Sequence, residues 1–472
     1  MSNLRWRVAL VGFLGCSLFA WAQIPEQYPR PLLHTPTNHP ADRVLIVIVD
    51  GMRAVDLENW VEKYPQSALA KLSLRGVSYT NAHVPWPDSA AGMMSFATGG
   101  TPISTGIFSS DGYDRSLSTP GAGCLATGAE LNFDVEDSSM PHDPAHDCAE
   151  LQPHKLVRVN SIFDLVHAAG GRTAWADERT AYADLLRGSS GTSLDEVFVP
   201  EIPDAESLID SARIGDEARV RAVLRWIDNT QTEVPRLFGV ALMSLDAAQR
   251  TASSSSDGGT KQIQAAFGQV DRLIGKITGE LEKSGLNNST WIIVTARHGH
   301  APTHEQVFRQ VDPTRIEAIA RVAAHGELAR VTADTVGIVW LKHPAATAAV
   351  LKAYRAKMTE TGIGEIYSSE KLRLIMNTSE EDSRMPDIVL EPQTGVIWMH
   401  RGEDQPVGHG GFSDDQNHVA LLVSGRQLQG RMDKTPVPIT QIAPLILRIL
   451  GMEKMDLKAL HQEHTPALPG IF

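Results

Sequence analysis

Three apolar segments of this 472-residue chain are each followed by a side chain that could bind a metal ion. Asp50 follows VLIVIV, Asp246 follows GVALMSL, and His298 follows WIIVTA with one arginine between. Such runs are typical of strands buried on both faces of a parallel sheet, and functional groups gather at the carboxyl ends of those strands. One aspartate at a strand end is usually a cap or turn residue. Three polar groups at equivalent ends predict a shared site.

Ser89 has the position of a nucleophile. It lies in PDSAAG at 87–92, directly before a helical stretch that TGG at 98–100 ends. Serine is a good helix N-cap, but a helix N-terminus also favours a bound phosphate and the alkoxide that attacks it. The sequence has no G-x-S-x-G segment, which argues against a Ser-His-Asp esterase. Carboxylate and imidazole groups near the serine instead indicate activation by a metal ion.

Further polar residues are candidates for the same site. His409 lies between glycines in VGHGG at 407–411, which lets the backbone come close while the imidazole points into a cavity. Taken alone, it is a loop histidine near a turn. Asp177 and Glu178 follow a predicted strand at 173–176, where they could face the site or cap the next segment. The histidines and aspartates at 142–147 are interpreted as part of a solvated loop.

Strands and helices alternate along the chain. Strands are predicted at 43–50, 77–84, 173–176, 237–245, 291–296, 387–399 and 419–424, and helices at 56–75, 160–169, 258–285 and 440–450. This order predicts an α/β fold with a doubly wound, mostly parallel sheet and helices on both faces. Residues 108–155 and 299–386 are interpreted as insertions, and the second is expected to form a small cap beside the site.

The N-terminus has the features of a secretory signal. Arg5 and Arg7 precede an apolar core at 8–19, and Ala20-Trp21-Ala22 supplies small residues around a cleavage site. We therefore expect a signal peptide at 1–22, a mature domain at 23–472 and a periplasmic or secreted protein, because the apolar run is short for a bilayer span. Removal of the signal leaves Cys124 and Cys148, which are expected to form one disulfide.

The charge balance bears on the partners. The chain has 43 Lys and Arg against 56 Asp and Glu, for a formal net charge of −13. A strongly acidic protein is a poor partner for a nucleic-acid polymer. A small phosphate ester remains a suitable substrate, because a local metal ion can outweigh the global charge.

Several short motifs of the sequence resemble those of a known group of hydrolases. Asp50-Gly51, PDSAAGMMSFATGG at 87–100, TARHG at 295–299 and GHGGF at 408–412 resemble the alkaline-phosphatase superfamily. The chain is most similar to secreted bacterial proteins of the type I phosphodiesterase/nucleotide pyrophosphatase group. The resemblance covers nearly the whole mature chain and includes GYDRSL at 112–117, RTAWADE at 172–178 and RMPDIV at 384–389.

The resemblance implies a serine-based hydrolase of phosphoric esters with two divalent metal ions, usually zinc. Asp50, Ser89 and His298 match one metal site of the family, and Asp246 and His409 match the other. A phosphoryl group would be transferred to Ser89 and then to water.

Two positions depart from the family pattern. Arg297 stands where the family has an aspartate before the histidine, and Arg250 stands where a histidine follows the second aspartate by four residues. A guanidinium cannot bind a metal, and the loss of two ligands leaves too few for a normal pair of zinc sites.

The departures leave three interpretations. Arg297 and Arg250 could replace metal charge and clamp the phosphate or a similar anion. One metal could survive, held by Asp50, His298 and an acid such as Asp414 or Asp415. The site could also be degenerate, in a periplasmic binding or scaffold protein. We favour a hydrolase with one or two divalent ions, acting on a phosphodiester or nucleotide pyrophosphate. The sequence does not choose among monoester, diester, pyrophosphate and sulfate.

Overall fold

The computed structural model describes residues 39–472 apart from 126, 136–139, 203–204, 230, 253–256, 302–308, 401–407, 454 and the side chains of 257–258. The signal peptide expected at 1–22 lies outside the described residues. Within the described part of the chain, no helix combines the length and the apolar character needed to cross a membrane.

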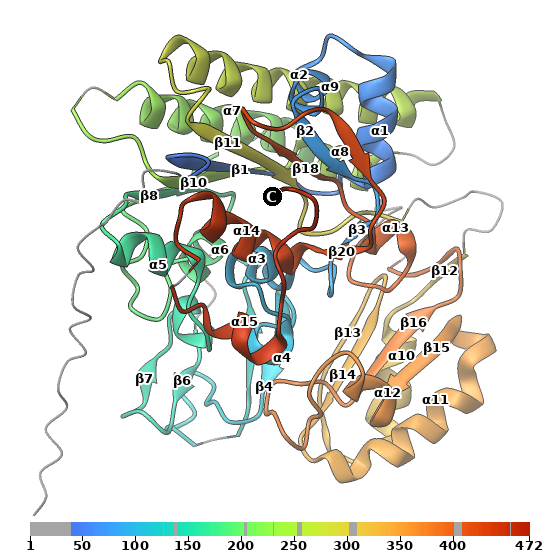
Figure 1. Ribbon diagram of the computed structural model, residues 1–472. Helices are drawn as coiled ribbons and strands as arrows, with labels where there is room; N and C mark the ends of the chain where they lie inside the picture. Colours follow the sequence, from blue (N-terminus) through green and yellow to red (C-terminus); the bar gives the residue numbers. More distant parts are fainter. Residues whose placement is uncertain are drawn as a thin grey trace, which may run out of the picture.

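A large, mostly parallel sheet forms the centre of the protein (Figure 1). Its strands in spatial order are β19 Arg431–Asp433, β2 Gly76–Tyr79, β18 Leu421–Ser424, β11 Thr290–Thr295, β1 Arg43–Val49, β10 Leu237–Leu242, β8 Thr173–Ala176 and β9 Glu196–Phe198. The strands from β11 to β9 are parallel, whereas β18 runs antiparallel to both of its neighbours. The sequence prediction of a mostly parallel sheet is confirmed.

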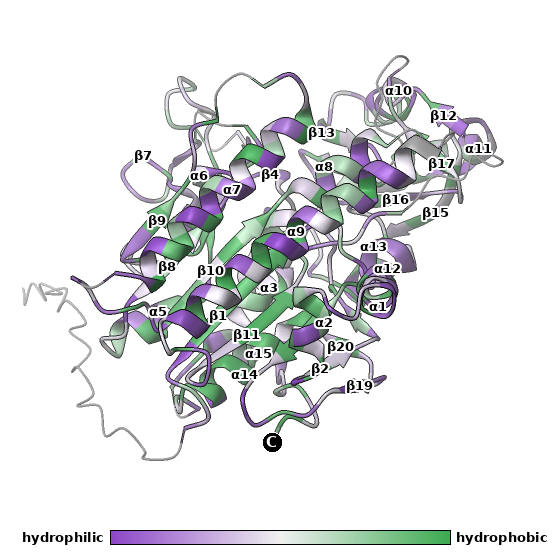
Figure 2. Ribbon diagram, turned by 90° about the horizontal axis from the view of Figure 1, so that it is seen from above, coloured by the Kyte–Doolittle hydropathy of each residue, from purple (hydrophilic) through white to green (hydrophobic). Residues whose placement is uncertain are grey.

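The central strands are apolar along their whole length because helices cover both faces of the sheet. β10 and β11 are buried at every position. One face carries α1 Ala54–Lys63, α2 Ala68–Ser73, α7 Leu208–Ile227, α8 Ser244–Thr251 and α9 Asp257–Lys283. The other carries α3 Ser89–Thr98, α5 Ile162–Ala168, α6 Thr180–Leu185 and α14 Ile442–Ile449. Figure 2 shows polar and apolar residues alternating along α7 and α9, whose apolar side packs on the green strands below.

Two predicted elements differ from the structure. The helix expected at 56–75 is divided into α1 and α2 around Pro65, because proline lacks the N–H that continues a helical hydrogen-bond ladder. The strand expected at 387–399 is two strands, β16 Ile388–Pro392 and β17 Val396–Trp398. Neither belongs to the main sheet.

A second, smaller lobe contains these strands. β16 pairs in a sheet with β13 Leu328–Ala333, β14 Gly337–Leu341 and β15 Ile363–Ser368, and β17 pairs with β12 Arg309–Val311. α10 Thr314–Ala323 and α11 Thr347–Thr361 pack against that sheet around a core of their own, which includes Val339, Tyr354 and Trp398. The lobe thus continues beyond residue 386, where the sequence placed its end.

An aromatic cluster joins the smaller lobe to the segment that carries Ser89. Trp86 packs against Phe108 with tilted rings whose centroids are 4.2 Å apart, and Phe108 meets Trp340 of β14 edge-on at 6.4 Å. Ala91 of α3 belongs to the same buried cluster. The smaller lobe therefore packs directly against the start of α3.

The insertion at 108–155 is built from short hairpins and one disulfide. β4 Asp111–Asp114 pairs with β5 Ala129–Asn132, and β6 His142–Asp143 pairs with β7 Ala149–Glu150. Cys124 and Cys148 form the expected disulfide, with Cα atoms 5.9 Å apart. His142 and His146 lie in this region and bond to Cys148 and Asp143 rather than to a shared ligand.

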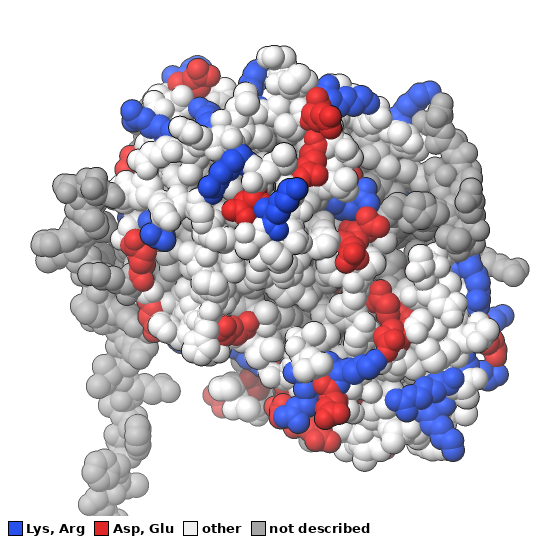
Figure 3. All heavy atoms as spheres, turned by 45° about the vertical axis from the view of Figure 1, so that its right-hand side comes forward, with Lys and Arg blue, Asp and Glu red and all other residues white. Residues whose placement is uncertain are grey.

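Charged side chains of both signs are interspersed over the face of the protein drawn in Figure 3. The acidic and basic groups alternate across both lobes in that view. The described part of this face thus carries no continuous basic track of the kind that follows a nucleic-acid backbone.

Gly92 sets the distance between α3 and the end of β11. A Cβ atom on Gly92 would lie 2.2 Å from the carbonyl oxygen of Arg297, so only a residue without a side chain lets the first turn of α3 pack so closely. This contact places Ser89, one turn earlier, beside the residues that follow β11.

We predict that Gly92→Ala lowers the free energy of unfolding by about 1–3 kcal/mol, because backbone must move to admit the methyl group. Thermal or denaturant unfolding measures the change. Gly279→Ala in α9 is the matched control, because its Cβ would meet no atom within 4 Å, and it should stabilise the protein by roughly 0.4–1 kcal/mol. Equal effects of the two variants would contradict the close packing.

Candidate active site

Four polar side chains converge beyond the carboxyl ends of β10 and β11. Ligand atoms of Asp246, His298 and His300 lie within 4.8 Å of one another, and all three residues are buried. The ring of His409 stacks on that of His298, with centroids 3.7 Å apart and planes inclined by 22°. His300 lies edge-on to both, at 5.3 Å from His298 and 5.7 Å from His409. We call these four residues the histidine cluster.

Asp246 is positioned by a buried acid on α7. Asp216 accepts hydrogen bonds from the backbone N–H groups of Met243 and Ser244, at 2.8 and 2.9 Å, and from the Ser244 hydroxyl. These bonds satisfy donors that the N-terminus of α8 leaves without helical partners. Arg219 balances the charge of Asp216 and also donates to Ala241 O. Asp246 therefore lies in the first turn of α8 rather than at the end of β10 itself.

His300 lies in a space left by Gly51. Gly51 has φ +79°, and a Cβ there would lie 2.7 Å from His300 Cδ2 and 2.0 Å from Gln249 Oε1. The Gly51 N–H also donates to His298 O at 3.1 Å, which ties β1 to the segment after β11. His300 Nε2 donates to Asp246 Oδ1 at 2.5 Å. Gly51 thus allows the turn after β1 and also leaves the space that the His300 imidazole occupies.

His409 reaches the histidine cluster from the segment between the two lobes. Thr335, between β13 and β14, donates its hydroxyl to His409 O. Gln416 donates to Gly408 O at 3.1 Å from α13 Asp414–Asn417. The smaller lobe therefore helps to hold one of the four clustered side chains.

Ser89 is the first residue of α3, and Asp88 is its N-cap. Asp88 Oδ1 accepts from the N–H groups of Ala90 and Ala91 at 2.9 and 3.1 Å. Ser110 also donates to this carboxyl group through its N–H and its hydroxyl. Ser89 is thus free of the capping role that its position allowed, and among the described residues its hydroxyl makes no hydrogen bond. The side chain is 6% exposed.

Arg297 fills the space next to Asp50. Its Nε donates to Asp50 Oδ2 at 2.7 Å, its Nη2 donates to the same oxygen, and its backbone N–H donates to Asp50 Oδ1 at 3.2 Å. Asp177 and Glu178 each lie 3.6 Å from the guanidinium. Arg297 and Asp50 are both fully buried. The acids after β8 therefore face the site and balance this arginine.

An aromatic and hydroxyl chain links Arg297 to the N-cap of α3. The guanidinium carbon lies 4.8 Å from the centre of the Tyr182 ring, and the Tyr182 hydroxyl donates to Asp134 and lies 3.1 Å from Ser110 Oγ. Ser110 in turn donates to Asp88. Burial raises the pKa of Tyr182 well above its ordinary value, so the phenol stays protonated as a donor.

The other candidates from the sequence lie less centrally. Arg250 Nη1 is 3.9 Å from Asp246 Oδ2, one helical turn along α8, so it borders the histidine cluster. Asp415 pairs with Arg53 at 2.5 Å, and its partner in the sequence prediction, Asp414, is exposed. Neither Asp414 nor Asp415 belongs to the group of side chains that the structure brings together.

The protonation states of the histidine cluster suit metal ligands. Burial and the neighbouring His300 lower the pKa of His298 to about 3. Burial, with His298 and His300 nearby, lowers the pKa of His409 well below its ordinary value. Burial opposes ionisation of Asp246, but His300 and Arg250 lower its pKa well below the usual range. At neutral pH His298 and His409 are thus neutral imidazoles near a carboxylate, the forms that bind metals.

The metal sites implied by the resemblance fit the residues unequally. In the histidine cluster, the buried Nδ1 atoms of His300 and His409 have no hydrogen-bond partner among the described residues. Carboxylate and imidazole donors at these separations fit one divalent ion such as zinc. Around Asp50 the fit fails, because a guanidinium already bonds both carboxylate oxygens through three N–H groups.

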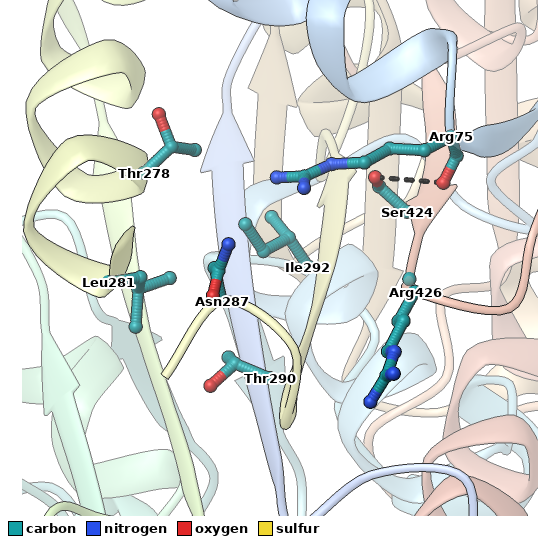
Figure 4. A pocket seen from close by; sticks show the side chains of 9 residues that line it. Arg75, Thr278, Leu281, Asn287, Thr290, Ile292, Ser424 and Arg426 are labelled. Atoms are coloured by element: carbon teal, nitrogen blue, oxygen red, sulfur yellow. Dashed lines mark hydrogen bonds between the residues drawn. The ribbon is translucent and has the colours of Figure 1, made fainter. Parts of the chain in front are cut away.

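The described pockets lie elsewhere. Figure 4 shows one of them, a cavity of about 10 Å³ lined by Arg75, Thr290, Ser424 and Arg426 among others. Thr290 begins β11 and Ser424 ends the antiparallel β18, so this cavity lies at the opposite end of the sheet from the histidine cluster. It has room for one water molecule. Cavities of about 400 and 300 Å³ belong to the smaller lobe.

The sequence prediction named Arg250, Arg297 and five further residues of this site, but not His300. The predicted residues Asp50, Ser89, Asp246, His298 and His409 all lie at the same end of the main sheet. His300 follows His298 by two residues in TARHGHA, and this H-x-H spacing was the signal available. The family pattern drew attention to Arg297 and away from the second histidine.

A buried strand-end acid, a serine at a helix N-terminus and a group of histidines beyond one parallel sheet define an alkaline-phosphatase-like protein. The chain belongs to the type I phosphodiesterase/nucleotide pyrophosphatase family, whose model matches residues 44–414. No curated protein matches the sequence significantly.

Solved structures share the fold at low sequence identity. Murine ectonucleotide pyrophosphatase/phosphodiesterase 5 is 16% identical with a TM-score of 0.64, and the match covers 88% of this chain and 96% of that one. The human protein of the same name is 16% identical with a TM-score of 0.62, and the match covers 88% of this chain and 96% of that one. The alkaline phosphatase PafA is 14% identical with a TM-score of 0.66, and the match covers 87% of this chain and 96% of that one. An inactive variant of the murine protein is in complex with AMP.

We predict that Arg297→Met destabilises the protein by about 3–5 kcal/mol, because Asp50 and Asp177 would stay buried without their cation. Chemical denaturation of both proteins in the same buffer measures this change. Arg321→Met on α10 is the control, because Arg321 is largely exposed in its pair with Glu317 and should change stability by less than about 1 kcal/mol. A loss at Arg297 no larger than at Arg321 would contradict the structural role of the buried pair.

Proposed function

We propose that the protein is an exported metal-dependent hydrolase of phosphoric esters, of the phosphodiester or nucleotide pyrophosphate type, with Ser89 as its nucleophile. Membership of a family of phosphoryl hydrolases supports this class of chemistry. The single observation that carries the proposal is the unbonded Ser89 hydroxyl at the N-terminus of α3, with Asp88 taking over the cap.

The helix N-terminus suits a nucleophile that attacks phosphorus. The N–H groups and dipole of a helix start stabilise negative charge on the serine oxygen and on the phosphoryl oxygens. In the proposed reaction Ser89 Oγ bonds to phosphorus as the bond from phosphorus to the leaving oxygen breaks, and the serine proton passes through solvent to that oxygen. Water then breaks the phosphoserine bond and restores the hydroxyl.

The residues around Ser89 would position this chemistry. Asp88, Ser110 and Tyr182 connect the start of α3 to Arg297 through buried contacts and so hold the backbone that carries Ser89 in place. The histidine cluster would hold a divalent ion, proposed to be zinc, which would supply a Lewis acid for the charge that develops on oxygen.

Two further features support the choice of substrate and location. The acidic chain disfavours a polymeric nucleic acid but suits a small ester bound at a local cation. The described disulfide is typical of an oxidising compartment, which agrees with a periplasmic or secreted protein after removal of residues 1–22. Nucleotide diesters are suitable first substrates, because a related murine protein has been solved with AMP.

We predict that Ser89→Ala lowers kcat/KM for a chromogenic phosphodiester by on the order of 10³-fold or more, because the nucleophile is lost. Ser95→Ala lies on the same helix, where its hydroxyl bonds only to Ala91 O, and should retain activity. Mass spectrometry of acid-quenched wild type should detect a phosphoryl adduct on Ser89. Full activity of Ser89→Ala would overturn the nucleophile, and inactivity of the wild type on mono-, di- and pyrophosphate esters would favour a binding protein.

A chelator should abolish the same hydrolysis, and added zinc should restore it. The reason is that His298 and His409 are neutral donors with no permanent charge to offer a phosphoryl group. Steady-state rates before and after dialysis against EDTA measure the effect. Undiminished hydrolysis by protein shown to be free of metal would contradict the metal requirement.

A further inference from the structure

Arg297 occupies the space beside Asp50 where the second divalent ion implied by the resemblance would bind. Both Asp50 oxygens accept hydrogen bonds from this residue, and Asp177 and Glu178 lie within 3.6 Å of its guanidinium. A metal ion at Asp50 would have to displace a buried cation that several acids stabilise. The charge at this position is therefore built into the chain.

His300 can supply a metal ligand next to Asp246, which Arg250 cannot. Arg250 stands one turn after Asp246, where the family pattern has a histidine, and its guanidinium cannot coordinate a metal. His300 lies in the segment after β11 and contacts Asp246 of α8, with Nε2 and Oδ1 2.5 Å apart. Both residues are almost fully buried. The hydrogen bond between these two donor atoms marks a position where a metal could lie between them, with the imidazole proton carried on Nδ1, which has no partner among the described residues.

The remaining imidazoles complete a donor set around the same point. His298 Nδ1 lies 3.2 Å from the carbonyl oxygen of Gly299, and its Nε2 lies 3.9 Å from Asp50 Oδ2, between the histidine cluster and the Arg297–Asp50 pair. His409 stacks on His298, and its buried Nδ1 has no partner among the described residues. Asp246, His298 and His300 thus offer one carboxylate and two imidazoles within 4.8 Å of one another, the three protein ligands of a zinc site that keeps one position open, and His409 borders this group.

We infer that this protein holds a single divalent cation in the histidine cluster, with His300 as a ligand that replaces the one lost at position 250, and that Arg297 takes the place of the second metal. The catalytic meaning of this site rests on the proposed function. The binding of one metal, however, can be measured whether or not the protein hydrolyses any ester.

Metal stoichiometry tests the inference directly. The metal-free full chain is titrated with Co²⁺ and with Zn²⁺, and bound metal is counted by elemental analysis while visible absorption follows the cobalt site. We expect one equivalent per chain, with a four-coordinate cobalt spectrum. Zero or two equivalents would overturn the single-metal site.

His300→Ala tests the new ligand. We expect affinity for the single equivalent to fall at least about 100-fold and the cobalt band to shift, because removal of an outer partner alone costs 10–100-fold. His167→Ala, on the exposed side of α5, is the control and should leave both unchanged. Unchanged affinity and spectrum in a folded His300→Ala variant would overturn the role of His300. One equivalent bound without any hydrolysis would refute the proposed function and leave the inference standing.

Arg297→Asp tests the replacement of the second metal. An aspartate at this position would remove the cation and add a second carboxylate beside Asp50, so the variant, purified with zinc, should bind two equivalents and gain thermal stability as zinc is added. A folded variant that still binds only one equivalent would contradict the assignment of Arg297 to the second metal's place. Circular dichroism establishes the fold, and the wild-type count decides the question if the variant does not fold.

Discussion

The buried ion pair between Arg297 and Asp50 is the interaction on which the rest of the site depends. Removing both charges from water is costly, and only multiple hydrogen bonds and neighbouring charges make it tolerable. Asp177, Glu178 and the Tyr182 ring supply those partners from β8 and α6. Because Tyr182 contacts Ser110, and Ser110 bonds to Asp88, the same interaction is also connected to the N-cap of α3, next to Ser89.

The site joins parts of the chain that are far apart in sequence. The N-terminal turn of α8 depends on Asp216 in α7, and the imidazole of His300 depends on the missing side chain at Gly51 after β1. The smaller lobe holds the backbone of His409 through Thr335. Trp86 and Phe108 pack against residues of the smaller lobe and so join that lobe to the main sheet domain. Chemistry at one end of the sheet thus relies on both cores.

Much of this could be predicted from sequence because buried parallel strands leave a plain signal. The runs at 43–50, 237–245 and 291–296 gave both the sheet and the positions of Asp50, Asp246 and His298. The division of the helix at Pro65 and the pairing of β16 in the smaller sheet depended on tertiary context that hydrophobic periodicity does not encode. His300 was missed for a related reason, since only the turn at Gly51 brings it to Asp246.

A metal ion is an exchangeable component, whereas an arginine side chain is made with the protein. At the edge of the sheet where Asp50 lies, the neutralising charge therefore arrives by translation and folding instead of by uptake from the surroundings. Its presence does not vary with the concentration of any ion, and it cannot be lost by dilution or competition. The positive charge beside Asp50 is in this sense encoded by the gene, and it cannot be exchanged for a stronger one.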